Sequence, residues 1–325
     1  MEHVADVAVS HLKRQVKSKE NSRLSPTAKK IADGAVAVRE TMPGEEDIAY
    51  FHSVLTQVSL PRRSTKERVF ERTSGNVSLR LSAGALWKPS NQKWVEQPLP
   101  SGSIPRYLWA WLNTYAIRNR TNEVLLGDSA RDFMEKIGYS VNGGKRGTYT
   151  SFLAQARALV ACQIQLGLPH GTFDGKVTET SHLWMEEDTR QRSLWPNRIV
   201  LAETYCKTLQ EHAVPLSNDA LLALRNNSLA LDIYAWLAQR LHRVQGRDGQ
   251  FVSWASLKQQ FGDEYAENND GRANFKKEFL RVLKIVKQLY PGARVQECFE
   301  PRRSKGKSNG LTLLASPPPI AKLVR

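Results

Sequence analysis

The segment GRANFKKEFLRVLKIVKQLYPG at residues 271–292 predicts a long helix with two different sides. At 100° per residue, the apolar side consists of Phe275, Phe279, Val282, Leu283, Val286, Leu289 and Tyr290. The opposite side carries five cations, which are Lys276, Lys277, Arg281, Lys284 and Lys287. Glu278 is the only acid in this predicted helix, so we expect the row of cations to be uncompensated. Pro291 and Gly292 end the helix because neither residue continues one readily.

Two interpretations of this helix are open. A lysine-rich side is common on helices that simply face solvent, and the alternative is a helix laid against nucleic acid. The whole chain has 47 Lys and Arg residues against 32 Asp and Glu, a formal net charge of +15 at pH 7. Such an excess favours an anionic partner, with nucleic acid ahead of a membrane surface.

The composition is that of an ordinary globular protein. Hydrophobic residues make up 41% and charged residues 24% of the 325 residues, enough for two or three domains. No apolar run approaches the ~20 residues of a membrane span, and the N-terminus lacks the apolar segment of an export signal. Cys162, Cys206 and Cys298 lie far apart, which fits reduced thiols. We therefore expect a soluble, cytoplasmic protein with no membrane partner.

The order of predicted elements occurs twice. The first copy has helices at 104–119, 129–137 and 148–161, a strand at 123–126 after the first helix, and a closing strand pair at 162–168 and 176–184. The second copy has helices at 228–244, 254–261 and 271–290, a strand at 251–253, and a closing pair at 294–299 and 311–314. Trp111 and Trp236 occupy matching places about 125 residues apart, which indicates a domain duplication.

Helix, strand, helix, helix and hairpin is the order of a winged helix, whose third helix enters the major groove. We predict an α+β fold with two tandem winged-helix domains, at residues 44–200 and 201–325. Residues 1–43 are predicted to be a loosely ordered N-terminal arm, in which Ser25 and Pro26 begin a short helix through Lys30. Ahead of the first copy, residues 48–55 show helical spacing and residues 69–86 suggest strands.

The second copy supplies most of the candidate DNA-binding residues. Helix-turn-helix proteins place base-contacting residues in the first turns of the last helix. We therefore assign base contacts to Arg272 and Asn274, with Lys276 and Lys277 beside them. Phosphate contacts are assigned to Arg281, Lys284 and Lys287 on the same helix, although these could instead meet a neighbouring protein surface. The wing loop adds Arg302, Arg303, Lys305 and Lys307, and the alternative for that loop is a disordered basic turn.

The first copy has fewer cations near its third helix. Its candidates are Lys145, Arg146, Thr148, Tyr149, Ser151 and Gln155. This set is typical of backbone positioning or weaker base contacts. An interaction face for a second protomer explains the same residues nearly as well.

The sequence lacks the motifs of the catalytic sites considered. The GxxxxGK[ST] phosphate loop is missing, because Pro301 stands where the first glycine before Gly306 and Lys307 should be. No two histidines flank a single residue, so Tyr149 and Tyr205 lack the metal site that a nicking tyrosine needs. The acidic run at 186–188 fits a solvated loop better than a metal site. We expect no catalytic residue, no metal and no cofactor.

Several segments match a known family. The longest is ALRNNSLALDIYAWL at residues 223–237, and shorter ones lie at 51–55, 60–62, 74–79, 102–106, 126–129, 143–147, 254–262 and 275–279. Across residues 48–314 the sequence resembles the plasmid replication initiator RepA family, which is carried by theta-replicating plasmids of Gram-negative bacteria. The resemblance implies two winged helices, binding to repeated origin sequences (iterons) in double-stranded DNA, and opening of an adjacent AT-rich region.

The resemblance also implies partners. They are the host initiator DnaA, the DnaB helicase, and a second copy of the chain in a homodimer that represses its own promoter. The alternative function is a plasmid or phage transcriptional repressor built from the same modules. An enzyme such as a nickase or a primase is the third candidate, and the missing motifs argue against it.

Overall fold

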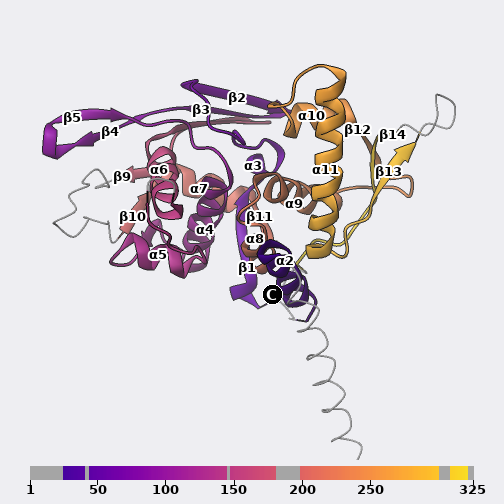
Figure 1. Ribbon diagram of the computed structural model, residues 1–325, viewed down its shortest axis with the longest axis horizontal. Coiled ribbons are helices and arrows are strands. Elements are labelled where there is room, and N and C mark those ends of the chain that lie inside the picture. Colours follow the sequence, from indigo (N-terminus) through magenta and orange to yellow (C-terminus); the bar gives the residue numbers. More distant parts are fainter. Residues whose placement is uncertain (1–24, 41–43, 145–146, 181–197, 300–307, 321–325) are drawn as a thin grey trace, which may run out of the picture.

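The computed structural model describes residues 25–40, 44–144, 147–180, 198–299 and 308–320. Helices and antiparallel strands are mixed along the whole described chain, as an α+β fold requires (Figure 1). One large hydrophobic core includes buried residues from the N-terminal helix, from the first half and from the second half, and Leu86 and Ala161 form a small separate cluster. No described helix is long and apolar enough to cross a membrane.

The first unit contains three helices and a three-stranded antiparallel sheet with the order β6-β10-β9. Its elements are α4 (Ser103–Asn119), β6 (Glu123–Leu125), α5 (Ala130–Lys136), α6 (Thr148–Ala161), β9 (Thr178–Thr180) and β10 (Arg198–Leu201). Ser129 caps α5, because the Ser129 hydroxyl accepts from the Asp132 N–H at 3.0 Å. The predicted boundaries of α6 agree with the structure to the residue.

The second unit repeats this arrangement. Its elements are α9 (Ser228–Leu241), β12 (Gln250–Ser253), α10 (Trp254–Phe261), α11 (Asn269–Leu289), β13 (Val295–Phe299) and β14 (Ser308–Leu313). The strand order β12-β14-β13 corresponds to β6-β10-β9 in the first unit. Both units therefore place the strand that follows the first helix at one edge, beside the last strand of the unit.

The prediction of the hairpin that closes the first unit was wrong. The strand β7 (Gln163–Leu168) pairs with β8 (Gly171–Lys176), and not with residues 176–184. This hairpin joins β2 (Val69–Ser74) and β3 (Val77–Ser82) in a separate sheet, β2-β3-β7-β8. Gly171, Asp174 and Gly175 are residue types depleted from strands, so propensity concealed β8. The pair that corresponds to β13 and β14 is β9 and β10.

The prediction of a loose arm was wrong for residues 26–40. The helix α2 (Pro26–Glu40) continues ten residues past Lys30 and packs against α8 (Asn218–Leu224) and α11. Ile31 and Ala35 are buried in the common core. Small residues let α2 approach closely, since a Cβ on Gly34 would lie 2.7 Å from the Cβ of Ala223. Small side chains contribute little to a hydrophobic pattern, so the sequence did not predict that α2 packs against α8 and α11. Residues 1–24 lie outside the described part.

The helical prediction for residues 48–55 was also partly wrong. Residues 48–52 form the strand β1 (Ile48–His52), which pairs with β11 (Ala213–Ser217), and only then does α3 (Ser53–Gln57) begin. The pairing partner is more than 160 residues away in sequence, so local periodicity could not reveal it. The helix α7 (Glu203–His212) precedes β11 and packs near β1 and β8.

Trp87 and Trp94 lie in a projecting hairpin. The hairpin consists of β4 (Ala85–Lys88) and β5 (Lys93–Glu96), joined through the short helix η2 (Pro89–Asn91), while η1 (Glu45–Asp47) precedes β1. The two tryptophans are cross-strand partners with ring centroids 5.5 Å apart. By contrast, Trp109 and Trp236 are buried and belong to the core.

Candidate nucleic-acid interface

The helix α11 is amphipathic because its apolar stripe and its cations occupy opposite sides. Asn268 caps its start, with the side-chain oxygen accepting from the Gly271 N–H at 2.8 Å. The apolar side is buried against α9, α2 and α10. Its buried members are Phe275, Phe279, Val282, Leu283, Val286 and Leu289, followed by Tyr290 just past the helix end. Packing of the apolar side holds α11 against the core, so the opposite side of the helix faces solvent.

The outward side of α11 carries most of the predicted contact residues. Those that are exposed are Arg272, Asn274, Lys277, Arg281, Lys284 and Lys287. Lys276 is the exception, because its side chain is only 30% exposed and its Nζ lies 2.9 Å from the Glu297 carboxylate. The same ammonium group lies 5.3 Å from the centre of the Trp254 ring, a cation–π distance. The Lys276 side chain is therefore held by Glu297 and Trp254 within the second unit.

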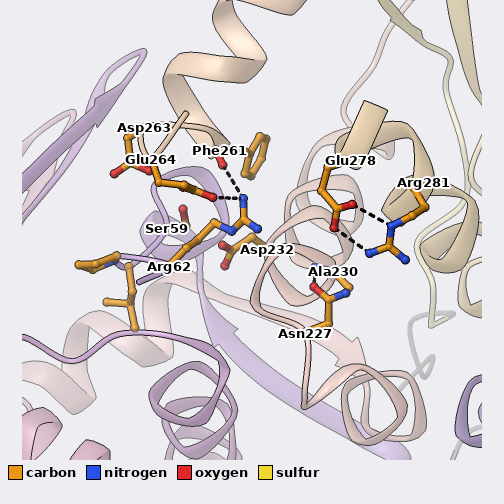
Figure 2. A network of polar contacts seen from close by, with 12 residues as sticks. Ser59, Arg62, Asn227, Ala230, Asp232, Phe261, Asp263, Glu264, Glu278 and Arg281 are labelled. Atoms are coloured by element: carbon orange, nitrogen blue, oxygen red, sulfur yellow. Dashed lines mark hydrogen bonds and ion pairs between the residues drawn. The ribbon is translucent and has the colours of Figure 1, made fainter. Parts of the chain in front are cut away.

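Acids compensate part of the cationic side, contrary to the prediction. Arg281 donates from Nε and Nη2 to both oxygens of Glu278, at 2.8 and 2.7 Å (Figure 2). This forked contact holds the pKa of Glu278 below its usual value and raises that of Arg281. Within the described residues, Lys277 and Lys284 form no ion pair or hydrogen bond. These two ammonium groups are thus available to an anion.

The start of α11 is positioned by a tight turn after α10. A Cβ on Gly262 would lie 2.5 Å from the Phe275 ring, so only glycine allows this approach. The carboxylate of Glu267, in the turn, forms ion pairs with two side chains. The Nζ atom of the buried Lys258 lies at 2.5 Å, and the Nη2 atom of the exposed Arg272 lies at 4.0 Å. Because the second contact is long and both of its side chains are solvated, it restrains Arg272 weakly.

The turn between α10 and α11 is clamped to the first half of the chain. Arg62 binds the Glu264 carboxylate at 2.5 Å and donates to the Phe261 carbonyl at 3.3 Å (Figure 2). Two further contacts, Arg72 with Asp263 and the Gln260 amide with the Gln57 carbonyl, lie at 2.5 Å each. Burial raises the pKa of Glu264, and the nearby Arg62 opposes that shift. The clamp sets the orientation of α11 relative to the first unit.

The third helix of the first unit, α6, uses several predicted contact residues for its own structure. The Thr148 hydroxyl accepts from the Asn142 N–H at 3.0 Å and donates to the Ser140 carbonyl at 2.6 Å. The Gln155 side-chain oxygen accepts from the Ser101 N–H at 2.8 Å. Tyr149 is half-buried against the core, and Ser151 is exposed. Among these four, Ser151 is the side chain with the most freedom to meet a ligand.

The basic loop residues of both units lie outside the described residues. They are Lys145 and Arg146 before α6, and Arg302, Arg303, Lys305 and Lys307 between β13 and β14. Their assignment to DNA remains a prediction from the sequence.

The described side chains do not gather into a metal site. Within the described ranges, no group of three or more His, Cys, Asp or Glu side chains could hold a metal ion. Cys162 is fully buried, and burial raises the pKa of its thiol to about 12, which suits a packing residue better than a nucleophile.

Sequence reasoning missed the clamp residues Arg62, Arg72, Asp263 and Glu264. They gave no signal because ion-pair partners about 200 residues apart follow no local pattern. Arg106 and Asp232, which join α4 to α9 through a buried ion pair, were missed for the same reason.

A comparison with protein families identifies the central part of the chain. Residues 99–256 match the family described as plasmid encoded RepA protein. Through these residues, the chain is similar to the plasmid RepA family. No curated protein matches the chain in sequence. The matched stretch runs from just before α4 into α10, so α11 lies beyond it.

Proposed function

We propose that this protein is a plasmid replication initiator of the RepA type, which binds DNA sequence-specifically and has no enzymatic activity. We also propose that its two units are tandem winged helices. In this proposal α11 lies in the major groove of an origin repeat, with Arg272 and Asn274 at base edges. Lys277, Lys284 and Lys287 meet phosphates, and α6 makes the weaker contacts of the first unit.

The observation that carries the proposal is the pair Lys277 and Lys284. Both lie on the outward side of a helix whose inward side is anchored in the core. Neither is neutralised by an acid in the described part of the chain, and the protein carries a net charge of +15. Unpaired cations on a rigid helix supply the non-specific share of DNA affinity at little cost in ordering.

The remaining steps of initiation extend this proposal. The protein opens an AT-rich region beside the repeats, recruits DnaA and DnaB, and represses its own promoter as a homodimer. It acts in the bacterial cytoplasm on plasmid DNA. These partners rest on the family relationship and not on a described surface.

Footprinting of the purified protein on the DNA that flanks its own gene tests the proposal. We expect protection of direct repeats at protein concentrations that leave random DNA unprotected. A plasmid that carries the gene and those repeats should also replicate in a suitable host, whereas a pure repressor would protect DNA without supporting replication. Equal binding to repeats and to random DNA would refute sequence-specific initiation.

A further inference from the structure

A polar hollow of about 560 Å³ lies between the two halves of the molecule, and none of its described lining residues belongs to α11. The first half contributes the end of β2 with the turn to β3, and Gln57 of α3. The other walls come from α9, β12 and α10 of the second unit. Figure 1 shows β2 and β3 reaching across to α10, which brings this turn to the second unit. The volume lies within the range of small-molecule sites, roughly 300–1,000 Å³.

Among the described residues that line the hollow, Arg240 is the one that is charged, and none is an aspartate or glutamate. Its Nε is shielded from solvent and has no acceptor within the described residues. Burial lowers the pKa of Arg240, which means that the surroundings disfavour its charge. A partly desolvated cation without a partner is costly, and a bound anion would offset that cost.

Neutral hydrogen-bond donors complete the lining. The Ser74 hydroxyl and the Gln259 amide line the hollow and make no hydrogen bond within the described part of the chain. Ser253 and Ser256 line it as well, with their hydroxyl oxygens 2.9 Å apart. A guanidinium fork surrounded by hydroxyl and amide donors, with no acid among the described lining residues, is the chemistry that recognises phosphate oxygens.

We propose that this hollow binds a phosphate group, with Arg240 as its principal ligand. The phosphate belongs either to the backbone of duplex DNA or to a free phosphorylated small molecule. The duplex source rests on the proposed DNA-binding function, whereas the free source does not.

Arg240→Gln is the main test variant, because it removes the charge and the fork and keeps most of the volume. It leaves no described partner unpaired, so we expect the folded state to be retained. Arg243→Gln is the matched control, since Arg243 is exposed at the same end of α9 and does not line the hollow. Arg240→Lys keeps the charge and removes the guanidinium fork. It is the second test variant, to be used if Arg240→Gln does not fold.

The first arm measures the Tm with added inorganic phosphate or a mononucleotide, against chloride at constant ionic strength. A free ligand source predicts a rise in Tm for the wild type and Arg243→Gln. It also predicts that Arg240→Gln loses this rise and that its apparent affinity falls roughly tenfold or more.

The second arm measures duplex affinity as a function of salt. A DNA source predicts that Arg240→Gln binds duplexes of all sequences more weakly and that its salt slope falls by about one, while Arg243→Gln is unchanged.

The proposal is overturned if Arg240→Gln matches the wild type in both arms, or if Arg243→Gln changes equally. If the wild type binds no DNA, the proposed function fails, and the first arm alone decides whether the hollow takes phosphate.

Discussion

Arg106 and Asp232 join the first helices of the two units through a buried, forked salt bridge. The Arg106 Nε donates to Oδ1 of Asp232 at 2.7 Å and Nη2 donates to Oδ2 at 3.0 Å, although 126 residues separate them. The remaining guanidinium hydrogens go to the carbonyls of Leu60, Pro61 and Gly102. The two side chains are 2% and 4% exposed, so all five donors are satisfied away from water.

Arg106→Met should cost about 3–5 kcal/mol in the free energy of unfolding, because it leaves the Asp232 charge buried without a partner. Urea denaturation followed by circular dichroism measures this loss.

The double variant Arg106→Met with Asp232→Leu should recover part of the loss, since the unpaired charge is gone. Recovery stays incomplete because the three carbonyls still lack their donor. Strictly additive effects of the two substitutions would contradict a direct coupling between these residues.

Gly34→Leu should destabilise the protein by about 1–3 kcal/mol, because Gly34 of α2 lies against Ala223 of α8 without room for a side chain. Helix propensity alone would favour leucine by up to about 1 kcal/mol, so a loss identifies the clash. Thermal unfolding measures it, with Val36→Ala as the control because Val36 is exposed on the same helix. If Gly34→Leu were as stable as the control, α2 would not be docked as described.

Stability should fall below pH 6.5 because of His52. Burial, with a smaller contribution from His212, lowers the pKa of His52 from 6.5 to about 3. Between these two values the unfolded chain binds the proton and the folded chain does not. The free energy of unfolding therefore decreases as pH falls through this window, by up to about 1.4 kcal/mol per pH unit.

Urea midpoints at pH 7 and pH 5 test this expectation with His52→Asn. Asparagine does not titrate, and its oxygen can replace Nδ1 as the acceptor of the Val54 N–H. The drop between the two pH values should shrink in this variant and stay unchanged in His170→Asn, which alters an exposed turn residue. An unchanged drop in His52→Asn would assign the pH dependence to other groups.

Lys284→Ala should weaken binding to every duplex alike and flatten the salt dependence by about one unit, since Lys284 has no described partner to lose. For about eight phosphate contacts, the slope of log K against log salt is near −7 in the wild type. Lys276→Ala should change the slope less, because Lys276 is already paired with Glu297. Fluorescence anisotropy at several salt concentrations compares the two. A larger change for Lys276 than for Lys284 would reverse the assignment.

Arg272→Ala should cost about 1–3 kcal/mol on the cognate repeat and relax preference at one base pair. Arg272 is 63% exposed at the start of α11, and its ion pair with Glu267 is long. Binding to a panel of single-base variants of the repeat measures the effect. Equal losses on all members of the panel would place Arg272 on the phosphate backbone.

The sequence predicted one part of the candidate site and did not predict another. The cationic side of α11 followed from periodicity, and its residues are exposed as predicted, apart from Lys276. The compensation of Lys276 by Glu297 did not follow, because β13 reaches α11 only through the folded sheet. The clamp between Arg62 and Glu264 was equally invisible for the same reason.

The sequence by itself determined α4, α6, α9, α10 and α11, because apolar periodicity, capping residues and helix-ending residues act within a few positions of one another. It also determined the order of elements that repeats in the second half. Only the tertiary structure decided that residues 26–40 pack as a helix, that β1 pairs with β11, and that β7 and β8 join β2 and β3. Each of these depends on contacts between distant segments, whose free energy appears only when the folded chain brings them together.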